Sequence, residues 1–203
     1  MQRVRLVLVL SALFLLIAPV VSQASCDTAL LVIDVQNWFL EWHPWLTASG
    51  EEIVPAIQSL LEMARGARIH IIYIRDLSLD RRGDNQTTLA IPEDIAPEDG
   101  DAVFTKTMGD ALTNPDLVEH LETNGIDRLL ISGIASDGCV TSTVRSAYRA
   151  GYELLIIADA HAHSAGEAQE TEQMNRMWLG WGLEGKPMTE IDWASLSCLD
   201  DGE

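Results

Sequence analysis

Apolar residues form two kinds of pattern along the chain, and the two kinds alternate. Five segments are short apolar runs of the kind found in strands of a buried parallel sheet. These runs are residues 29–36, 67–76, 101–106, 127–133 and 152–159. Three further segments place apolar residues at helical spacing and end at glycine or proline signals. These segments are residues 51–66, 115–125 and 137–150.

The alternation of strands and helices predicts an α/β fold. We expect a three-layer α/β/α sandwich with a mostly parallel, Rossmann-like sheet and right-handed crossovers. Residues 165–203 predict one more helix and a short final element. The loop at residues 77–100 is long and polar, and loops of that length in compact domains tend to be functional or mobile. The sequence shows no internal repeat and no linker, which indicates a single domain.

The N-terminal residues have the three parts of a secretory signal peptide. Arg3 and Arg5 give a basic start, a long apolar run follows, and Ser22-Gln23-Ala24 forms a cleavage site with small residues. The apolar run is shorter than the roughly 20 residues of a spanning helix, which disfavours a retained anchor. A lipoprotein signal is also disfavoured, because it needs an aliphatic residue in place of Gln23.

We therefore expect a signal peptide over residues 1–24, a domain over residues 25–203, and a protein that is periplasmic or secreted. The chain carries 13 basic and 31 acidic residues, a formal charge of −18. Such acidity repels nucleic acid and anionic lipid, so we expect neither as a partner, and no membrane attachment after signal cleavage. Solubility outside the cytoplasm explains the acidity without a specific cationic partner.

The chain has three cysteines, which is an odd number for an oxidising compartment. Cys26 precedes the first strand and Cys198 lies near the end, so both flank the core. We expect these two to form a disulfide, which leaves Cys139 free. The alternative is that all three are free thiols.

Three residues capable of chemistry lie where strands end. Asp34 ends the first apolar run, Lys106 ends residues 101–106, and Cys139 follows residues 127–133 after a short turn. In parallel sheets, ligands bind outside the carboxyl ends of the strands, so the topology places all three at one edge. The alternative for each residue alone is structural: a turn-capping aspartate, a surface lysine, a small apolar cysteine.

The environment of Cys139 is expected to favour its thiolate. Ser136 or Asp137 would cap a helix whose first turn holds the cysteine, where the helix dipole favours negative charge. Lys106 would supply a positive charge, and Asp34 would accept the thiol proton as general base. Backbone amides of the preceding turn would form an oxyanion hole.

Three sequence blocks resemble the isochorismatase-like cysteine hydrolases. They are LLVIDVQNWF at residues 30–39, FTKT at 104–107 and ISGIASDGCVTSTVRSAYRAGYELLIIADA at 131–160. The last block is the most specific. Its matching positions are Gly133, Asp137, Cys139, Val140, Thr143, Ala147, Gly151, Asp159 and Ala160. The resemblance extends from about residue 28 to residue 180.

This resemblance implies specific roles. Asp34, Lys106 and Cys139 would form the Asp–Lys–Cys catalytic triad of the family. A non-proline cis peptide would join Ile134 and Ala135, and the amides of Ala135 and Cys139 would form the oxyanion hole. The implied reaction is acyl transfer through a thioester, although the namesake enzymes of the family hydrolyse a vinyl ether.

Departures from the family concern metal and substrate. Nicotinamidases carry an Asp-x-His pair and a further histidine for zinc, whereas YIRDLSLDRRGD here contains no histidine. We therefore expect no catalytic metal, no cofactor and a substrate other than nicotinamide. His161 and His163 lie two residues apart as possible metal ligands, but a polar loop at a strand end is the favoured interpretation, since no third ligand is evident.

The segment NWFLEWHPWL at residues 37–46 is rich in aromatic residues. Phe39, Trp42 and Trp45 would wall the substrate pocket, or would pack in the core or at a subunit interface. We predict Phe39 and Trp42 as pocket residues, and we expect a homo-oligomer.

The sequence thus predicts an exported cysteine hydrolase that cleaves a C–N bond in a small amide or ureido molecule. Two alternatives are a vinyl-ether hydrolase of the isochorismatase type and a catalytically silent family member that acts as a binding or assembly module. A thiol-redox role is disfavoured, because no C-x-x-C motif accompanies Cys139.

Overall fold

A computed structural model describes residues 27–78 and 89–197 of the 203-residue chain. The predicted signal peptide, Cys26, Cys198 and most of the first half of the loop at 77–100 lie outside the described residues. The strands are β1 (Thr28–Ile33), β2 (His70–Asp76), β3 (Ala102–Lys106), β4 (Arg128–Ile134), β5 (Glu153–Ala162) and β6 (Glu184–Lys186). The helices are α1 (Asn37–Leu40), α2 (Ile53–Gly66), α3 (Pro115–Thr123), α4 (Thr141–Ala150) and α5 (Ala168–Gly180).

The six strands form one parallel sheet in the order β3-β2-β1-β4-β5-β6. This is the order of doubly wound folds, in which the chain first builds outward from β1 and then returns to build the other half from β4. The predicted Rossmann-like sheet is therefore confirmed. The carboxyl ends of β1 and β4 are neighbours at the point where the direction of building reverses.

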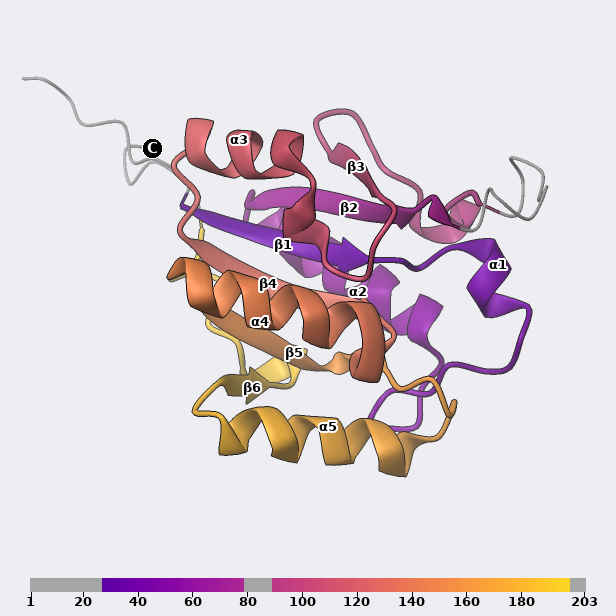
Figure 1. The fold of residues 1–203 in the computed structure, drawn as a ribbon. Helices are drawn as coiled ribbons and strands as arrows, with labels where there is room; N and C mark the ends of the chain where they lie inside the picture. The colour runs from indigo at the N-terminus through magenta and orange to yellow at the C-terminus, as the bar shows by residue number, and fades with distance from the viewer. Residues whose placement is uncertain (1–26, 79–88, 198–203) are drawn as a thin grey trace, which may run out of the picture.

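Helices cover both faces of the sheet and create two separate cores (Figure 1). The helix α2 packs on one face, where Ile53, Ile57 and Leu60 belong to one buried cluster with residues of β1, β2 and β5. On the other face α3, α4 and α5 bury Leu117, Val144 and Trp178 among others. Both faces of the central strands are thus removed from water, which is why β1 reads as a continuous apolar run.

Most element boundaries agree with the sequence prediction within a few residues. The strand β5 runs three residues further than expected, so it includes His161. The short helix α1 was not predicted, and the four-residue length explains why its periodicity carries no signal. Among the described residues, no helix combines the length and apolar character that a membrane span requires.

One close approach between the central strands requires a glycine. Gly133 of β4 pairs with Ile33 of β1 and has φ +111°. A Cβ atom at this position would lie 2.1 Å from the Ile33 carbonyl oxygen. Only glycine fits this position, because both the backbone conformation and the space exclude a side chain.

Candidate active site

The candidate site lies at the carboxyl edge of the sheet, beside the switch between β1 and β4. Asp34 follows β1 directly, in the left-handed region at φ +56°. Its amide donates to the Ile74 carbonyl at 2.9 Å, which ties the residue to the neighbouring strand β2. Aspartate tolerates this conformation better than most residues. The carboxylate is fully buried.

The ammonium group of Lys106 is the centre of the site. Its Nζ lies 2.7 Å from Asp34 Oδ2 and 3.3 Å from Cys139 Sγ. The lysine side chain is buried although it carries a charge, and buried charges need partners that offset the lost hydration. The structure thus brings together Asp34, Lys106 and Cys139 from three separate parts of the chain.

A fourth residue, Asp76, completes the set of partners around Lys106. Asp76 ends β2 directly opposite Lys106 in the register of β3, and its Oδ2 lies 3.2 Å from Nζ. Its other oxygen accepts the amide of Ser78 at 2.7 Å. Asp76 is not among the residues predicted from the sequence, although it ends the apolar run at residues 67–76 as Asp34 and Lys106 end theirs.

Gln36 holds the two acidic strand ends together. It is fully buried, and its Oε1 accepts the backbone amide of Asp76 at 2.7 Å. Its Nε2 donates to the Leu89 carbonyl at 2.8 Å. A buried glutamine with both ends bonded links the loop after β1 to the end of β2, and this link positions the carboxylates of Asp34 and Asp76.

Asp34, Asp76 and Cys139 form a cluster of donors that could bind a cation, and the ammonium group of Lys106 is that cation. The carboxylates of Asp34 and Asp76 and the thiol of Cys139 lie within 4.8 Å of one another, as metal ligands do. Lys106 contacts all three, so its ammonium takes the place at which these donors converge.

Cys139 lies in a distorted turn before α4. Residues Ser136–Val140 form a wide π turn, and Gly138, with φ −119° and ψ −109°, interrupts the helical conformation. The Ala135 carbonyl accepts the amides of Gly138 and Val140 at 2.9 and 3.2 Å, which folds the turn tightly. The peptide bond between Ile134 and Ala135 is cis. Cys139 is half-buried and is a free thiol.

The predicted helix caps are wrong. Ser136 does not cap the helix, because its hydroxyl bonds to His161 Nδ1 at 2.7 Å. The carboxylate of Asp137 instead accepts the backbone amide of Ser164 at 3.0 Å and lies 3.5 Å from His163 Nε2. Ser136 therefore holds the turn against the end of β5, and Asp137 holds it against the segment that follows β5.

His161 is a buried support for this turn, not a residue of a polar loop as expected. Asn175 donates its Nδ2 to the Ala158 carbonyl, which leaves its Oδ1 to accept from His161 Nε2 at 2.8 Å. The other ring nitrogen, Nδ1, is then the acceptor for the Ser136 hydroxyl. Burial lowers the pKa of His161 to about 4, so the imidazole is neutral at pH 7.

Burial also changes the ionisation of the central groups. It raises the pKa of Asp34 to about 6, although the charge of Lys106 opposes the shift. It raises the pKa of Cys139 to about 12, and the negative charge of Asp34 adds to this effect. The pKa of Lys106 is raised by its acidic neighbours, which outweigh its own burial. The expectation of a stabilised thiolate in the free protein is therefore wrong: the resting thiol is protonated.

The aromatic residues before α2 divide between core and surface. Trp45 is buried in the core, and its Nε1 donates to the Phe39 carbonyl at 2.9 Å. Phe39 is half-buried against the same core, while Trp42 is 57% exposed. The ring of Trp42 meets the edge of Trp38, with the centroids 4.1 Å apart. A role for Phe39 and Trp42 in a substrate pocket stays a prediction.

Comparisons with known proteins agree with this arrangement. The family profile of the isochorismatase domain matches residues 28–181. The ureidoacrylate amidohydrolase RutB of Stutzerimonas stutzeri is 26% identical over 203 residues, covering 80% of this chain and 81% of that protein. A relative from Arabidopsis thaliana, named as a probable inactive nicotinamidase, is 29% identical over 181 residues, covering 76% of this chain and 90% of that protein.

A solved structure has the same fold. The N-carbamoylsarcosine amidase of Thermoplasma acidophilum superposes with a TM-score of 0.66 at 23% identity, covering 82% of this chain and 99% of that one. The family profile spans the strands β1 to β5 and includes Asp34, Asp76, Lys106 and Cys139. The chain therefore belongs to the isochorismatase family of hydrolases.

Proposed function

We propose that this protein is an exported cysteine hydrolase that cleaves a C–N bond of a small amide or ureido compound through a thioester at Cys139. The observation that carries the proposal is the single buried ammonium of Lys106, in contact with both the Asp34 carboxylate and the Cys139 thiol. The name of the relative RutB, a ureidoacrylate amidohydrolase, supports the substrate class.

In the acylation step, the sulfur of Cys139 attacks the substrate carbonyl carbon while its proton passes to Asp34. The electron pair of the C=O bond moves onto oxygen, where the amides of Ala135 and Cys139 would stabilise the negative charge. The C–N bond then breaks, the nitrogen takes the proton from Asp34, and the amine or ammonia leaves. The acyl group is now a thioester of Cys139.

In the deacylation step, Asp34 takes a proton from a water molecule as the water oxygen attacks the thioester carbon. The C–S bond breaks, the acid is released, and the sulfur regains the proton that Asp34 held. Lys106 remains protonated throughout and offsets the negative charge that moves between Asp34 and the sulfur. The net reaction adds one water across the C–N bond.

The proton on the resting thiol fits this sequence. Because the pKa of Cys139 is raised to about 12 and that of Asp34 to about 6, the proton rests on sulfur at pH 7 and the carboxylate is ready to accept it. A side-chain hydrogen bond between Cys139 and Asp34 raises the pKa of the thiol and lowers that of the carboxyl, so the proton already lies beside its acceptor.

The vinyl-ether hydrolase and the silent binding module remain alternatives. The first has the family's namesake chemistry in its favour. The second has the relative named as an inactive nicotinamidase. The retained contacts of Asp34, Lys106 and Cys139 disfavour loss of activity.

A substrate panel distinguishes the three possibilities. The mature chain, residues 25–203, is assayed with ureidoacrylate, N-carbamoylsarcosine, a simple primary amide and isochorismate. We expect release of ammonia from a ureido compound, and a loss of about 10³-fold or more in kcat/KM for Cys139→Ala. Ser59→Ala on α2 is the matched control and retains activity.

Other outcomes select the alternatives. Turnover of isochorismate alone assigns the ether reaction. If no compound in the panel reacts, the protein is a silent family member.

Export has its own test. Expression of the full chain in a bacterial host is followed by intact-mass measurement of the periplasmic and medium fractions. We expect a chain that begins at Ser25. An uncleaved chain confined to the cytoplasm would contradict export and leave the proposed chemistry untouched.

A further inference from the structure

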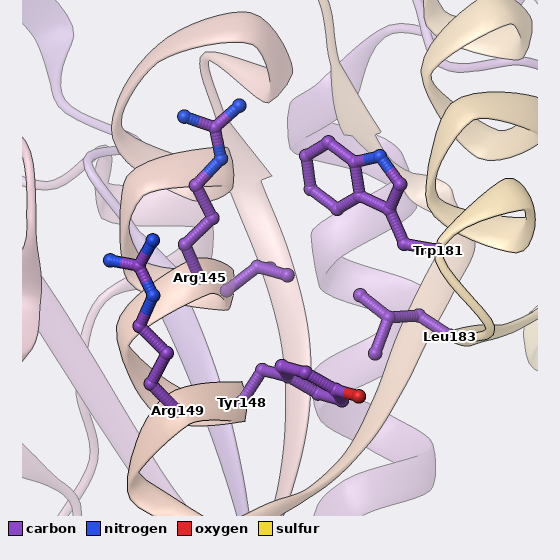
Figure 2. A pocket seen from close by; sticks show the side chains of 6 residues that line it. Arg145, Tyr148, Arg149, Trp181 and Leu183 are labelled. Carbon is purple, nitrogen blue, oxygen red and sulfur yellow. The ribbon is translucent and has the colours of Figure 1, made fainter.

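A hollow of about 280 Å³ lies between α4 and the segment that follows α5, beside residues of α4 that come after the nucleophile turn (Figure 2). Six side chains line it: Val144, Arg145, Tyr148, Arg149, Trp181 and Leu183. Val144 and Leu183 are buried and form an apolar floor. No part of the reaction proposed above uses these residues.

The walls of this hollow are aromatic rings left open to water. Tyr148 is 61% exposed and Trp181 is 40% exposed, and Figure 2 shows them at opposite ends of the hollow with Leu183 between them. Large aromatic side chains that remain exposed around an apolar floor mark a binding surface more often than isolated exposed residues do. Their flat faces suit a flat apolar molecule.

The rim carries positive charge in a strongly acidic chain. Arg145 and Arg149 are one helical turn apart on α4, and the guanidinium of Arg145 lies 5.1 Å from the centre of the Trp181 ring. Neither arginine forms a salt bridge with a carboxylate in the part of the chain that the structure describes. Arg75 also has no carboxylate partner there, but its guanidinium donates to the Leu89 carbonyl. Five other basic side chains there are ion-paired: Arg65, Lys106, Arg128, Arg176 and Lys186.

The absence of acidic partners at this rim needs an explanation in a chain with 31 acidic residues. Arg149 stands in the last turn of α4, where a positive charge offsets the helix dipole. That role does not account for Arg145, which lies a turn earlier and stacks against Trp181. Two guanidinium groups beside an apolar hollow are complementary to a carboxylate or sulfonate attached to a flat ring.

We propose that this hollow is a binding site for a small organic anion with a flat apolar body, such as an aromatic carboxylate. The volume sets the size, because about 280 Å³ is at the lower end of ligand pockets and accommodates one or two rings. The anionic group binds Arg145 and Arg149 while the ring lies between Tyr148 and Trp181. The site is distinct from the candidate active site: Tyr148 is nine residues beyond Cys139, about 13 Å along the chain axis of a helix.

The test uses 2-naphthoate as the probe and its neutral amide, 2-naphthamide, for comparison. Binding to the mature protein is measured by titration calorimetry. Cys139 is first alkylated by iodoacetamide at raised pH, where more of its thiolate forms, and intact mass confirms that the candidate active site is blocked. We expect one naphthoate site that weakens at least tenfold in the double variant Arg145→Gln/Arg149→Gln and that weakens with added salt. Naphthamide binding changes less than threefold in that variant.

Two further variants control the result. Arg176→Gln removes an exposed arginine from α5 that pairs with Glu172, and it leaves naphthoate affinity within twofold of the parent protein. Trp181→Ala weakens naphthoate and naphthamide together, because it removes the shared ring contact. All four side chains are exposed, so these variants are expected to fold.

Three outcomes would overturn the proposal. They are no binding up to about 10 mM naphthoate, equal affinity in the double variant and the parent, or binding to unmodified protein that disappears when Cys139 is alkylated. A change of oligomeric state in the double variant, measured by sedimentation, would also overturn it and assign the hollow to a second copy of the chain.

Discussion

At the residue scale, the candidate site depends on one shared cation. Lys106 is buried with two carboxylates and a thiol within 3.3 Å of its nitrogen. Removing one partner from such a cluster leaves an uncompensated buried charge, which costs about 3–5 kcal/mol in comparable pairs. The cluster is therefore more sensitive to loss of Lys106 than to conservative changes around it. Asp76 is the partner whose role is least evident from the sequence. The pH dependence of kcat/KM tests that role.

The activity is expected to rise with pH through the ionisation of Asp34. The pKa of Asp34 is raised to about 6, so below that pH the carboxyl is protonated and cannot accept the thiol proton. Plots of kcat/KM against pH should climb about tenfold per unit below pH 6 and then level. The plateau extends far into alkaline pH, because the pKa values of Cys139 and Lys106 are both raised.

Asp76→Asn provides the informative variant. The negative charge of Asp76 contributes to the raised pKa of Asp34, so its removal should move the acid limb to lower pH and reduce the plateau several-fold. If the acid limb of the kcat/KM profile stays at the same pH while the plateau value falls, Asp76 has only a structural role. Thermal unfolding of the variant checks that the fold persists.

At the scale of elements, the turn between β4 and α4 is held from two sides. On one side Gly133 lets β4 approach β1 closely, and on the other the hydrogen bonds from Ser136 through His161 to Asn175 join the turn to α5. The position of Cys139 thus depends on a close backbone contact and on a series of hydrogen bonds between side chains. Gly133, Ser136 and His161 are buried, so water cannot take their place.

Gly133→Ala should be among the most destabilising single changes in the protein. The added Cβ would lie 2.1 Å from a backbone oxygen and would force φ away from +111°, so we expect a loss of more than about 3 kcal/mol in unfolding free energy. The matched control is Gly66→Ala in α2, where a Cβ would meet nothing within 4 Å. Urea unfolding of both variants measures the difference, and equal midpoints would refute the close approach.

At the scale of the whole molecule, two buried groups oppose each other in acid. The folded chain keeps His161 neutral down to about pH 4, so as pH falls below 6.5 the unfolded chain takes up the proton first and stability declines. Asp34 acts in the opposite sense, because its raised pKa lets the folded chain take up a proton first as pH falls through about 6. The change in unfolding free energy on acidification therefore contains two contributions of opposite sign, one from His161 and one from Asp34.

His161→Gln separates the two contributions. At pH 7 the variant is less stable than the parent, because the bonds to Ser136 and Asn175 are weakened. Between pH 7 and pH 4 the parent loses on the order of 3 kcal/mol of unfolding free energy through His161, and the variant does not. The difference in unfolding free energy between parent and variant therefore becomes smaller in acid. Urea unfolding at several pH values measures this difference, with His120→Gln, a less buried histidine, as the control. If the difference in unfolding free energy between parent and variant stays constant with pH, His161 is not buried in its neutral form.

The sequence predicted those features that depend on local pattern and on topology. Buried strands and strand-end residues follow from the apolar runs, and the order of the strands then brings Asp34 and Lys106 to one edge. The supports were missed because they depend on tertiary contacts. Gln36 and Asn175 are ordinary polar residues until their partners, 40 and 14 positions away, are known. The ionisation of Cys139 was also mispredicted, because burial outweighs the nearby lysine.

The raised pKa of Cys139 has a further consequence for how the sulfur survives oxidants. Peroxides and disulfides react with the thiolate, and burial together with the charge of Asp34 holds the pKa of the thiol well above pH 7, so little thiolate forms. Without substrate, the sulfur is therefore a poor target for oxidants. This protection of an unpaired cysteine would suit the export proposed above.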